Sequence, residues 1–221
     1  MDDATNKGNG SILDGSVRAL LDSLASSSPA PGGGAAAALT GALGAALVQM
    51  TANLTIGKPR YASVHEQARA LESAADTARH RLEELADEDS AAFARVSAAY
   101  GLPRATDGER ADRDAAIQDS LRGAAQVPLE TARTCRQVLH LAEGAAPVLN
   151  RSVIADVMVG AQLANAGLAG AAINVEVNIA SITDPAAALG LRAELDVVVA
   201  GATELRERIV AAGRARLVAL N

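Results

Sequence analysis

Polar side chains interrupt an apolar segment near the middle of the chain, and they are the first candidates for chemistry. The segment runs from residue 152 to about residue 182 and carries Asp156, Asn174 and Asn178 among alanine, glycine and valine. On a helix these three side chains project close to one line, although Asp156 and Asn174 are about 27 Å apart along the axis. Buried carboxylates and amides need hydrogen-bond partners or water. The pattern predicts either hydrogen bonds between helices or the lining of a polar pocket.

A proline and three glycines open the other apolar segment, which covers residues 35–56. Glycine allows a ligand to approach the backbone, and the first N–H groups of a helix, with its positive dipole end, favour an anion. The Lys-Ser/Thr pair of a phosphate-binding loop does not follow, so a nucleotide site is not indicated. Gly32, Gly33 and Gly34 therefore predict contact with a carboxylate, a phosphate or a ring edge, with an ordinary loop as the alternative.

The composition indicates what must position these residues. The chain has 221 residues, of which 49% are hydrophobic and only 1% aromatic, so alanine, leucine and valine fill the core. Small side chains let helix backbones approach closely, and alanine is the strongest helix former. We predict an all-α fold, a bundle of long helices around two buried helices rich in small residues. The expected helices cover residues 12–27, 35–56, 64–100, 107–142, 152–182 and 185–217, with a kink or break at Pro128 and caps at Thr106 or Asp107, at Ser152 and at Asp184.

Charge, cysteine content and hydropathy narrow the function classes. The formal net charge is −6 with no basic run, which argues against nucleic-acid binding. Cys135 is the only cysteine, so no internal disulfide or multi-cysteine metal site is possible, as expected of a cytoplasmic protein. Residues 1–10 are polar and are predicted to be a disordered tail without a signal peptide, ahead of a single domain over residues 11–221. The first apolar segment is short for a membrane span and the second too polar, so both are predicted to be core helices, with a membrane oligomer as the weaker alternative.

Four ordered motifs resemble the cyclodeaminase/cyclohydrolase family, the C-terminal half of formiminotransferase-cyclodeaminase and its stand-alone relatives. The first motif is PAPGGGAAAALTGALGAALVQMTANLTIGKPRY, and DEDSAAFARVSAAYGLPRATDGERADR follows it. AAQVPLETA resembles the family's Val-Pro-Leu turn. NRSVIADVMVGAQLANAGLAGAAINVEVNIASITD resembles its Asn-x-Ser-x-x-x-Asp helix with terminal asparagines. The resemblance as a whole covers about residues 12 to 218.

The resemblance implies a dimeric all-α enzyme with a folate site where helices meet at the subunit interface. It implies chemistry at the one-carbon unit between N5 and N10 of tetrahydrofolate. Either 5,10-methenyltetrahydrofolate is hydrolysed to 10-formyltetrahydrofolate, or 5-formiminotetrahydrofolate cyclises and releases ammonia. Both reactions need a group that moves a proton and groups that hold an amidinium-like cation. No metal, and no cofactor beyond the tetrahydrofolate substrate, is implied.

The same resemblance assigns roles to individual residues. Catalysis is expected of Asp156, Asp89 and Lys58, although Asp89 also fits a solvated helix face. Lys58 is expected either to bind the carboxylates of the ligand or to steer a proton, and it also fits a helix C-terminal cation. Asp156 is the preferred residue for proton transfer or for stabilising the cationic carbon, because a carboxylate on a buried helix is costly without a task or a partner. The expected substrate-binding residues are Gly32, Gly33, Gly34, Phe93, Asn150, Ser152, Asn174 and Asn178.

This chain departs from the family pattern at three places. Ala35 stands where the family has serine, Arg104 replaces a lysine, and Pro59-Arg60 replaces a lysine-rich pair. These departures are compatible with a repurposed paralogue, and a non-catalytic folate-binding or scaffold protein is the alternative from another class. The lack of a transferase half in this chain favours the cyclohydrolase reaction slightly over the cyclodeaminase reaction.

Overall fold

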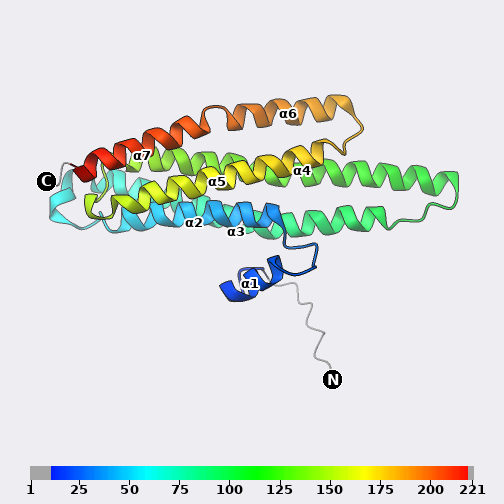
Figure 1. Cartoon of the computed structure of the whole chain (residues 1–221), viewed down its shortest axis with the longest axis horizontal. Helices are drawn as coiled ribbons and strands as arrows, with labels where there is room; N and C mark the ends of the chain where they lie inside the picture. Colours follow the sequence, from blue (N-terminus) through cyan, green and yellow to red (C-terminus); the bar gives the residue numbers. More distant parts are fainter. Residues whose placement is uncertain (1–10, 219–221) are drawn as a thin grey trace, which may run out of the picture.

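The computed structural model describes residues 11–218, and every element in that range is helical (Figure 1). This confirms the predicted all-α class. The tail predicted over residues 1–10 lies outside the described residues. The elements are α1 (Val17–Leu24), α2 (Gly33–Asn53), η1 (Pro59–Val64), α3 (His65–Tyr100), α4 (Asp107–Ala145), η2 (Arg151–Val153), α5 (Ile154–Ile179), α6 (Pro185–Val199) and α7 (Ala202–Val218).

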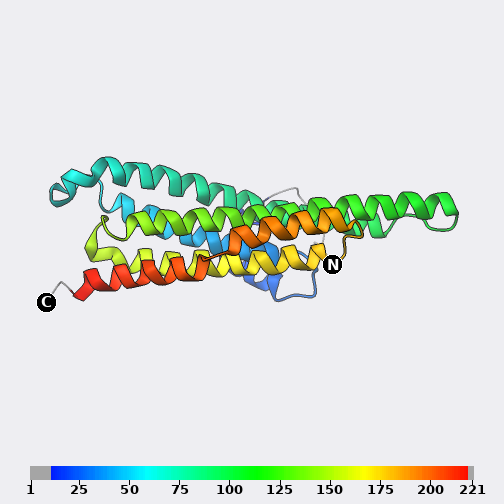
Figure 2. The same cartoon turned by 90° about the horizontal axis from the view of Figure 1, so that it is seen from above.

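Four long helices form the body of the bundle. Helix α2 packs against α3 and α5, and α4 packs against the same two helices from the other side. Helices α6 and α7 run along α4 and α5, as both views show (Figures 1 and 2). Helix α1 has no buried residue and lies outside the four-helix body (Figure 1). The segment before it is attached to α3, because the Ile12 N–H donates to Asp87 Oδ1 at 2.8 Å.

Glycines set the close crossing of the antiparallel helices α2 and α5. A Cβ atom at Gly44 would lie 2.7 Å from the Gly160 carbonyl oxygen, and one at Gly167 would lie 2.8 Å from the Ala37 carbonyl oxygen. Both distances are shorter than a side chain tolerates, so larger residues would force the two backbones apart. The crossing fixes the register of α5 against α2 and therefore which residues meet at each end of the bundle.

Three local predictions need correction. The helix predicted over residues 185–217 is two helices, because Gly201 adopts φ +68° and turns the chain between α6 and α7. Pro128 lies buried inside α4, which runs through it without a break. Ser152 does not cap α5: it lies within η2, where its own N–H donates to Asn150 Oδ1 at 3.1 Å.

Two helices are long and apolar enough to cross a membrane by length and composition alone. They are α2 and the stretch Arg151–Ile179. An apolar run of 18 residues in each is 56% buried in α2 and 39% buried in the second stretch. The core helix of a water-soluble fold passes the same test, so this finding is weak evidence for a membrane. The buried share of the second stretch is smaller because α5 carries exposed apolar side chains, among them Val159, Ile173 and Val177.

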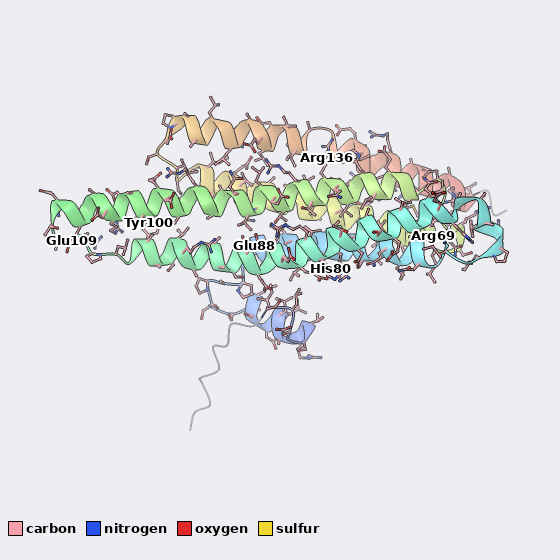
Figure 3. All side chains as sticks on the ribbon, turned by 180° about the vertical axis from the view of Figure 1, so that it is seen from behind. Arg69, His80, Glu88, Tyr100, Glu109 and Arg136 are labelled. Carbon is pink, nitrogen blue, oxygen red and sulfur yellow. The ribbon has the colours of Figure 1, made fainter. Side chains whose placement is uncertain are left out.

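The two broad faces of the bundle differ in chemistry. Helices α3 and α4 carry charged side chains on the side shown in Figure 3, including the ion pairs of Arg81 with Glu84 and Glu88. Helices α2 and α5 instead present exposed apolar side chains, and we call this surface the α2–α5 face. It comprises Leu43, Met50, Leu54, Val159, Ile173 and Val177, which are 38–64% exposed. Exposed apolar side chains gathered on two neighbouring helices are typical of an interaction surface.

Candidate functional site

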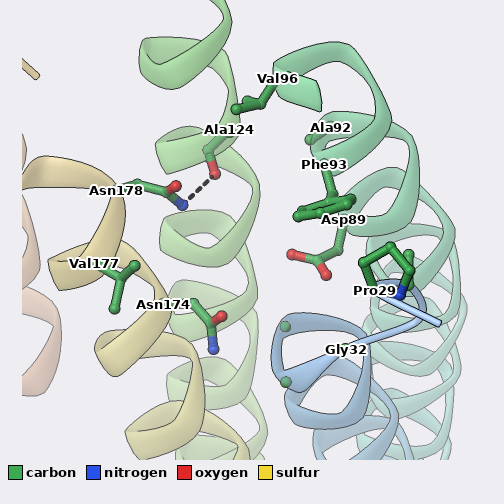
Figure 4. A pocket seen from close by; sticks show the side chains of 13 residues that line it. Pro29, Gly32, Asp89, Ala92, Phe93, Val96, Ala124, Asn174, Val177 and Asn178 are labelled. Carbon is green, nitrogen blue, oxygen red and sulfur yellow. Dashed lines mark hydrogen bonds between the residues drawn. The ribbon is translucent and has the colours of Figure 1, made fainter. Parts of the chain in front are cut away.

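A cavity of about 320 Å³ opens at the N-terminal end of α2 (Figure 4). Four elements meet there: the loop that enters α2, the C-terminal third of α3, α4 at one residue, and the C-terminal part of α5. Seven of the residues predicted from the sequence line this cavity, which we call the glycine-end pocket. They are Gly32, Gly33, Gly34, Asp89, Phe93, Asn174 and Asn178.

Asp89 reaches from α3 to the first turn of α2. Its Oδ2 accepts a hydrogen bond from the Ala35 N–H at 3.0 Å. A carboxylate from another helix therefore bonds one of the N–H groups that have no partner within the first turn of α2. Gly34 makes this approach possible, because a Cβ atom at that position would overlap the Asp89 carboxylate. The glycine and the aspartate are therefore one structural unit, although 55 positions separate them in the sequence.

Backbone donors face the same space. Gly32 is the N-cap of α2 and has no side chain to bond the following N–H groups. The hydrogen bonds among residues 11–218 leave the Gly33 and Gly34 N–H groups without a partner. Together with the dipole of the 21-residue helix, these groups favour a ligand atom of negative partial charge. The pocket thus offers donors and a carboxylate side by side.

Burial raises the pKa of the Asp89 carboxyl above its ordinary value. Loss of solvent is the larger cause, and the hydrogen bond from the Ala35 N–H opposes it. A carboxylate with a raised pKa is a stronger base than an exposed aspartate and takes up a proton closer to neutral pH. Asp89 is therefore suited to proton transfer.

The raised pKa gives the stability of the fold a defined pH dependence. The folded chain holds the Asp89 proton more tightly than the unfolded chain, so the protonated state favours folding and this contribution is lost as pH rises through the folded pKa. We expect the unfolding free energy of the wild type, measured by urea denaturation between about pH 3 and about pH 7, to fall relative to that of Asp89→Asn. A difference that stays constant or changes in the opposite direction contradicts the pKa assignment.

The amides and the aromatic ring complete the pocket. Asn178 Nδ2 donates to the Ala124 carbonyl at 3.0 Å, and Asn174 Nδ2 donates to the Gly170 carbonyl at 2.9 Å. Because these bonds use the amide nitrogens, the Oδ1 atoms remain as acceptors, and the Asn174 amide lies beside Gly33. Phe93 is 43% exposed and stands over Asp89, where its ring can cover a planar ligand (Figure 4).

The remaining predicted residues lie at the opposite end of the bundle. Lys58 precedes η1, while Asn150, Ser152 and Asp156 lie around η2 and the first turn of α5. Asn150 is 2% exposed and holds this end together, since its Nδ2 donates to the Leu54 carbonyl and its N–H donates to Thr55 Oγ1. Asp156 is partly exposed. Eighteen residues, about 27 Å of helix, separate it from Asn174, so one protomer does not bring its predicted residues into a single site.

Several pocket residues were not predicted. Pro29 and Ala30 precede the glycines, Val96 lies one turn beyond Phe93, and Val177 lies between the two asparagines of α5. Helical spacing could have indicated Val96 and Val177, because each lies three residues from a predicted residue on the same helix. Ala124 on α4 carries no signal in the sequence, since it contributes only a backbone carbonyl to Asn178.

The geometry defines what the pocket can do. A basic carboxylate, two amide oxygens and an aromatic face suit a planar ligand that carries positive charge, and the carboxylate can move a proton. The free N–H groups of α2 can stabilise an oxygen that gains negative charge during the reaction.

Comparisons with known proteins agree on one relationship. A family model described as formiminotransferase-cyclodeaminase matches residues 16–197. A methenyltetrahydrofolate cyclohydrolase of Methylorubrum extorquens is 46% identical over 193 residues, which are 87% of this chain and 93% of that protein. A formimidoyltransferase-cyclodeaminase of Rattus norvegicus is 37% identical over 79% of this chain, and the match spans only 32% of that longer protein. The crystal structure of a formiminotetrahydrofolate cyclodeaminase from Thermotoga maritima has a TM-score of 0.83 at 28% identity, covering 93% of this chain and 99% of that one.

Proposed function

This chain belongs to the formiminotransferase-cyclodeaminase family, and from that premise we propose that it hydrolyses 5,10-methenyltetrahydrofolate to 10-formyltetrahydrofolate. It is a folate one-carbon enzyme that acts between N5 and N10 of tetrahydrofolate. The cyclohydrolase reaction is preferred over ammonia-releasing cyclisation because the cyclohydrolase relative matches at 46% identity over nearly its whole length. The single observation that carries the chemistry is the Asp89 carboxylate at the glycine start of α2.

The proposed reaction has two steps. Water adds to the methenyl carbon of the N5–CH–N10 cation, and its proton passes to the Asp89 carboxylate. The resulting tetrahedral carbon then loses its bond to N5, which takes a proton back from Asp89. The hydroxyl proton leaves to water as the C=O bond forms, so the one-carbon unit stays on N10 as a formyl group and one proton is released overall. The free N–H groups of Gly33 and Gly34 are suited to the oxygen of the tetrahedral intermediate. The Asn174 and Asn178 oxygens and the Phe93 ring are suited to the cationic ring system.

We further propose a homodimer in which the α2–α5 face is the interface. Val177 belongs both to this face and to the pocket lining, so a second copy seated on the face would lie at the mouth of the pocket. A two-fold axis near Asn165, the midpoint between Asp156 and Asn174, would place the partner's Asp156 opposite Asn174. The arrangement would join the two groups of predicted residues, including Lys58, that one protomer keeps apart. We propose no metal or redox cofactor, no nucleic-acid or membrane partner, and a cytoplasmic location.

The direct test follows the loss of the near-ultraviolet absorbance of 5,10-methenyltetrahydrofolate in the presence of the purified protein. We expect the loss to be faster than in buffer and the product to be 10-formyltetrahydrofolate. A protein that leaves this rate unchanged but converts 5-formiminotetrahydrofolate, with release of ammonia, is a cyclodeaminase. A protein that binds folate and converts neither substrate contradicts both reactions and supports the non-catalytic alternative.

A further inference from the structure

A group of arginines without acidic partners lies at the opposite end of the bundle from the glycine-end pocket. Arg60, Arg151 and Arg216 line a surface depression of about 240 Å³ together with Tyr61. They come from three separate elements, η1, η2 and α7, so the fold rather than a local run of sequence brings them together. We call this group the arginine cluster.

Within the described residues, no carboxylate balances the positive charge of the arginine cluster. Nine other arginines form ion pairs with carboxylates, but within residues 11–218 no Asp or Glu oxygen lies within ion-pair distance of Arg60, Arg151 or Arg216. Lys58 lies two positions before Arg60 and is also unpaired in the same range. Like charges held together in this way destabilise the fold unless an anion joins them.

Hydrogen bonds within the fold account for Arg216 but not for Arg151. Arg216 donates from Nη1 to the Ala146 carbonyl at 2.6 Å and from Nη2 to the Leu149 carbonyl at 2.8 Å, which satisfies carbonyls at the C-cap of α4 and in the loop that follows it. Arg151 has no such role. Its Nε and Nη2 atoms are enclosed, yet they have no hydrogen-bond partner among the described residues. Buried guanidinium donors without a partner are costly, so an anion that reaches Arg151 would lower the free energy of this part of the fold.

The backbone around Arg151 is held rigidly. Its N–H donates to the Tyr61 hydroxyl at 3.0 Å, and that hydroxyl lies 3.4 Å from Asn150 Oδ1. The Arg60 guanidinium lies over the Tyr61 ring at 5.9 Å. Tyr61 thus fixes two members of the cluster, and a site whose donors are already in place loses little entropy when it binds.

We propose that the arginine cluster is a binding site for a multiply charged oxyanion, a phosphate or a group of carboxylates. Guanidinium groups bind both through paired, charge-assisted hydrogen bonds. The site is distinct from the glycine-end pocket, because the 21 residues of α2 place about 30 Å between the two ends of one protomer. Two sources supply this chemistry. One is free phosphate or a phosphate ester, and the other is the glutamate tail of a folate held in a partner's pocket, which rests on the proposed function and dimer.

The test measures ligand-dependent thermal stabilisation and calorimetric binding at constant ionic strength, with sodium chloride as the comparison salt. The probes are inorganic phosphate and a γ-linked triglutamate that carries no pterin. We expect at least one probe to raise the melting temperature of the wild type more than sodium chloride does. Arg151→Met, which removes the charge at similar length, should bind that probe at least about tenfold more weakly. Arg214→Met changes an exposed arginine on α7 and should respond as the wild type does.

The outcomes separate the two sources and the two proposals. A response to phosphate identifies a phosphate site, and a response to triglutamate alone identifies a carboxylate site; both support the inference. No response to either probe, or equal responses in the wild type and Arg151→Met, overturns it. If Arg151→Met fails to fold, Arg60→Met gives the same comparison from the exposed side of the cluster. Asp89→Asn should keep the probe response while losing turnover, so failure of one proposal leaves the other testable.

Discussion

We expect Asp89→Asn to lower kcat for hydrolysis of 5,10-methenyltetrahydrofolate by about 10²- to 10⁴-fold, the range typical of losing a general acid–base group. Asparagine keeps the size of the side chain and an oxygen that can accept from the Ala35 N–H, so the start of α2 stays capped. It cannot take the proton of the attacking water or return one to N5. The measurement is the initial rate of absorbance loss at saturating substrate, with the fold checked by circular dichroism.

A matched control lies one position away on α3. Glu88 points to the outer charged face and pairs with Arg81, so Glu88→Gln removes a carboxylate from the same helix without touching the pocket. We expect its kcat to stay within about twofold of the wild type, as for most surface substitutions. If Asp89→Asn also stays within that range, proton transfer belongs to another group and the role proposed for Asp89 is wrong.

The parts of the fold that the sequence predicts well depend on local chemistry. Thr106 caps α4 in a capping box with Glu109, and Asp184 caps α6 ahead of Pro185. Both arrangements need only residues that are close in sequence. The break between α6 and α7 was missed because Gly201 differs from an ordinary helical glycine only in its positive φ. The Ser152 cap was wrong because the tertiary bonds of Asn150 to Leu54 and Thr55 hold the chain in a short 3₁₀ turn first.

For the candidate site, the sequence identifies residues but does not show which of them meet in space. The family motifs identified the glycines, Asp89 and the α5 asparagines, and the structure places these residues around one pocket. Asp156, the preferred catalytic residue, lies at the other end of the bundle. Helical periodicity gives the direction of a side chain around the axis, and Asp156 and Asn174 do project the same way. It does not say which end of a helix meets which neighbour, and the antiparallel packing of α5 on α2 sends Asp156 to the end opposite Gly34.

The position of Asp156 leads to the second large prediction, which tests whether two chains share each site. If the partner's Asp156 completes the pocket that holds Asp89, Asp156→Asn should be nearly inactive, as Asp89→Asn is. We expect a mixture of the two inactive variants, unfolded and refolded together in equal amounts, to recover about a quarter of wild-type activity. Random pairing makes half of the dimers mixed, and each mixed dimer holds one intact site of its two.

The control and the contrary outcome follow from the same geometry. Each variant refolded alone should stay inactive, and size-exclusion chromatography should show dimers in all samples. Leu43→Glu places a charge on the α2–α5 face, where the exposed leucine would be buried in the dimer, so it should shift the protein towards monomers. It should also prevent recovery when introduced into both variants. A mixture that stays inactive while its dimers exchange subunits places Asp89 and Asp156 in separate sites, and an Asp156→Asn protein with full activity removes Asp156 from the chemistry altogether.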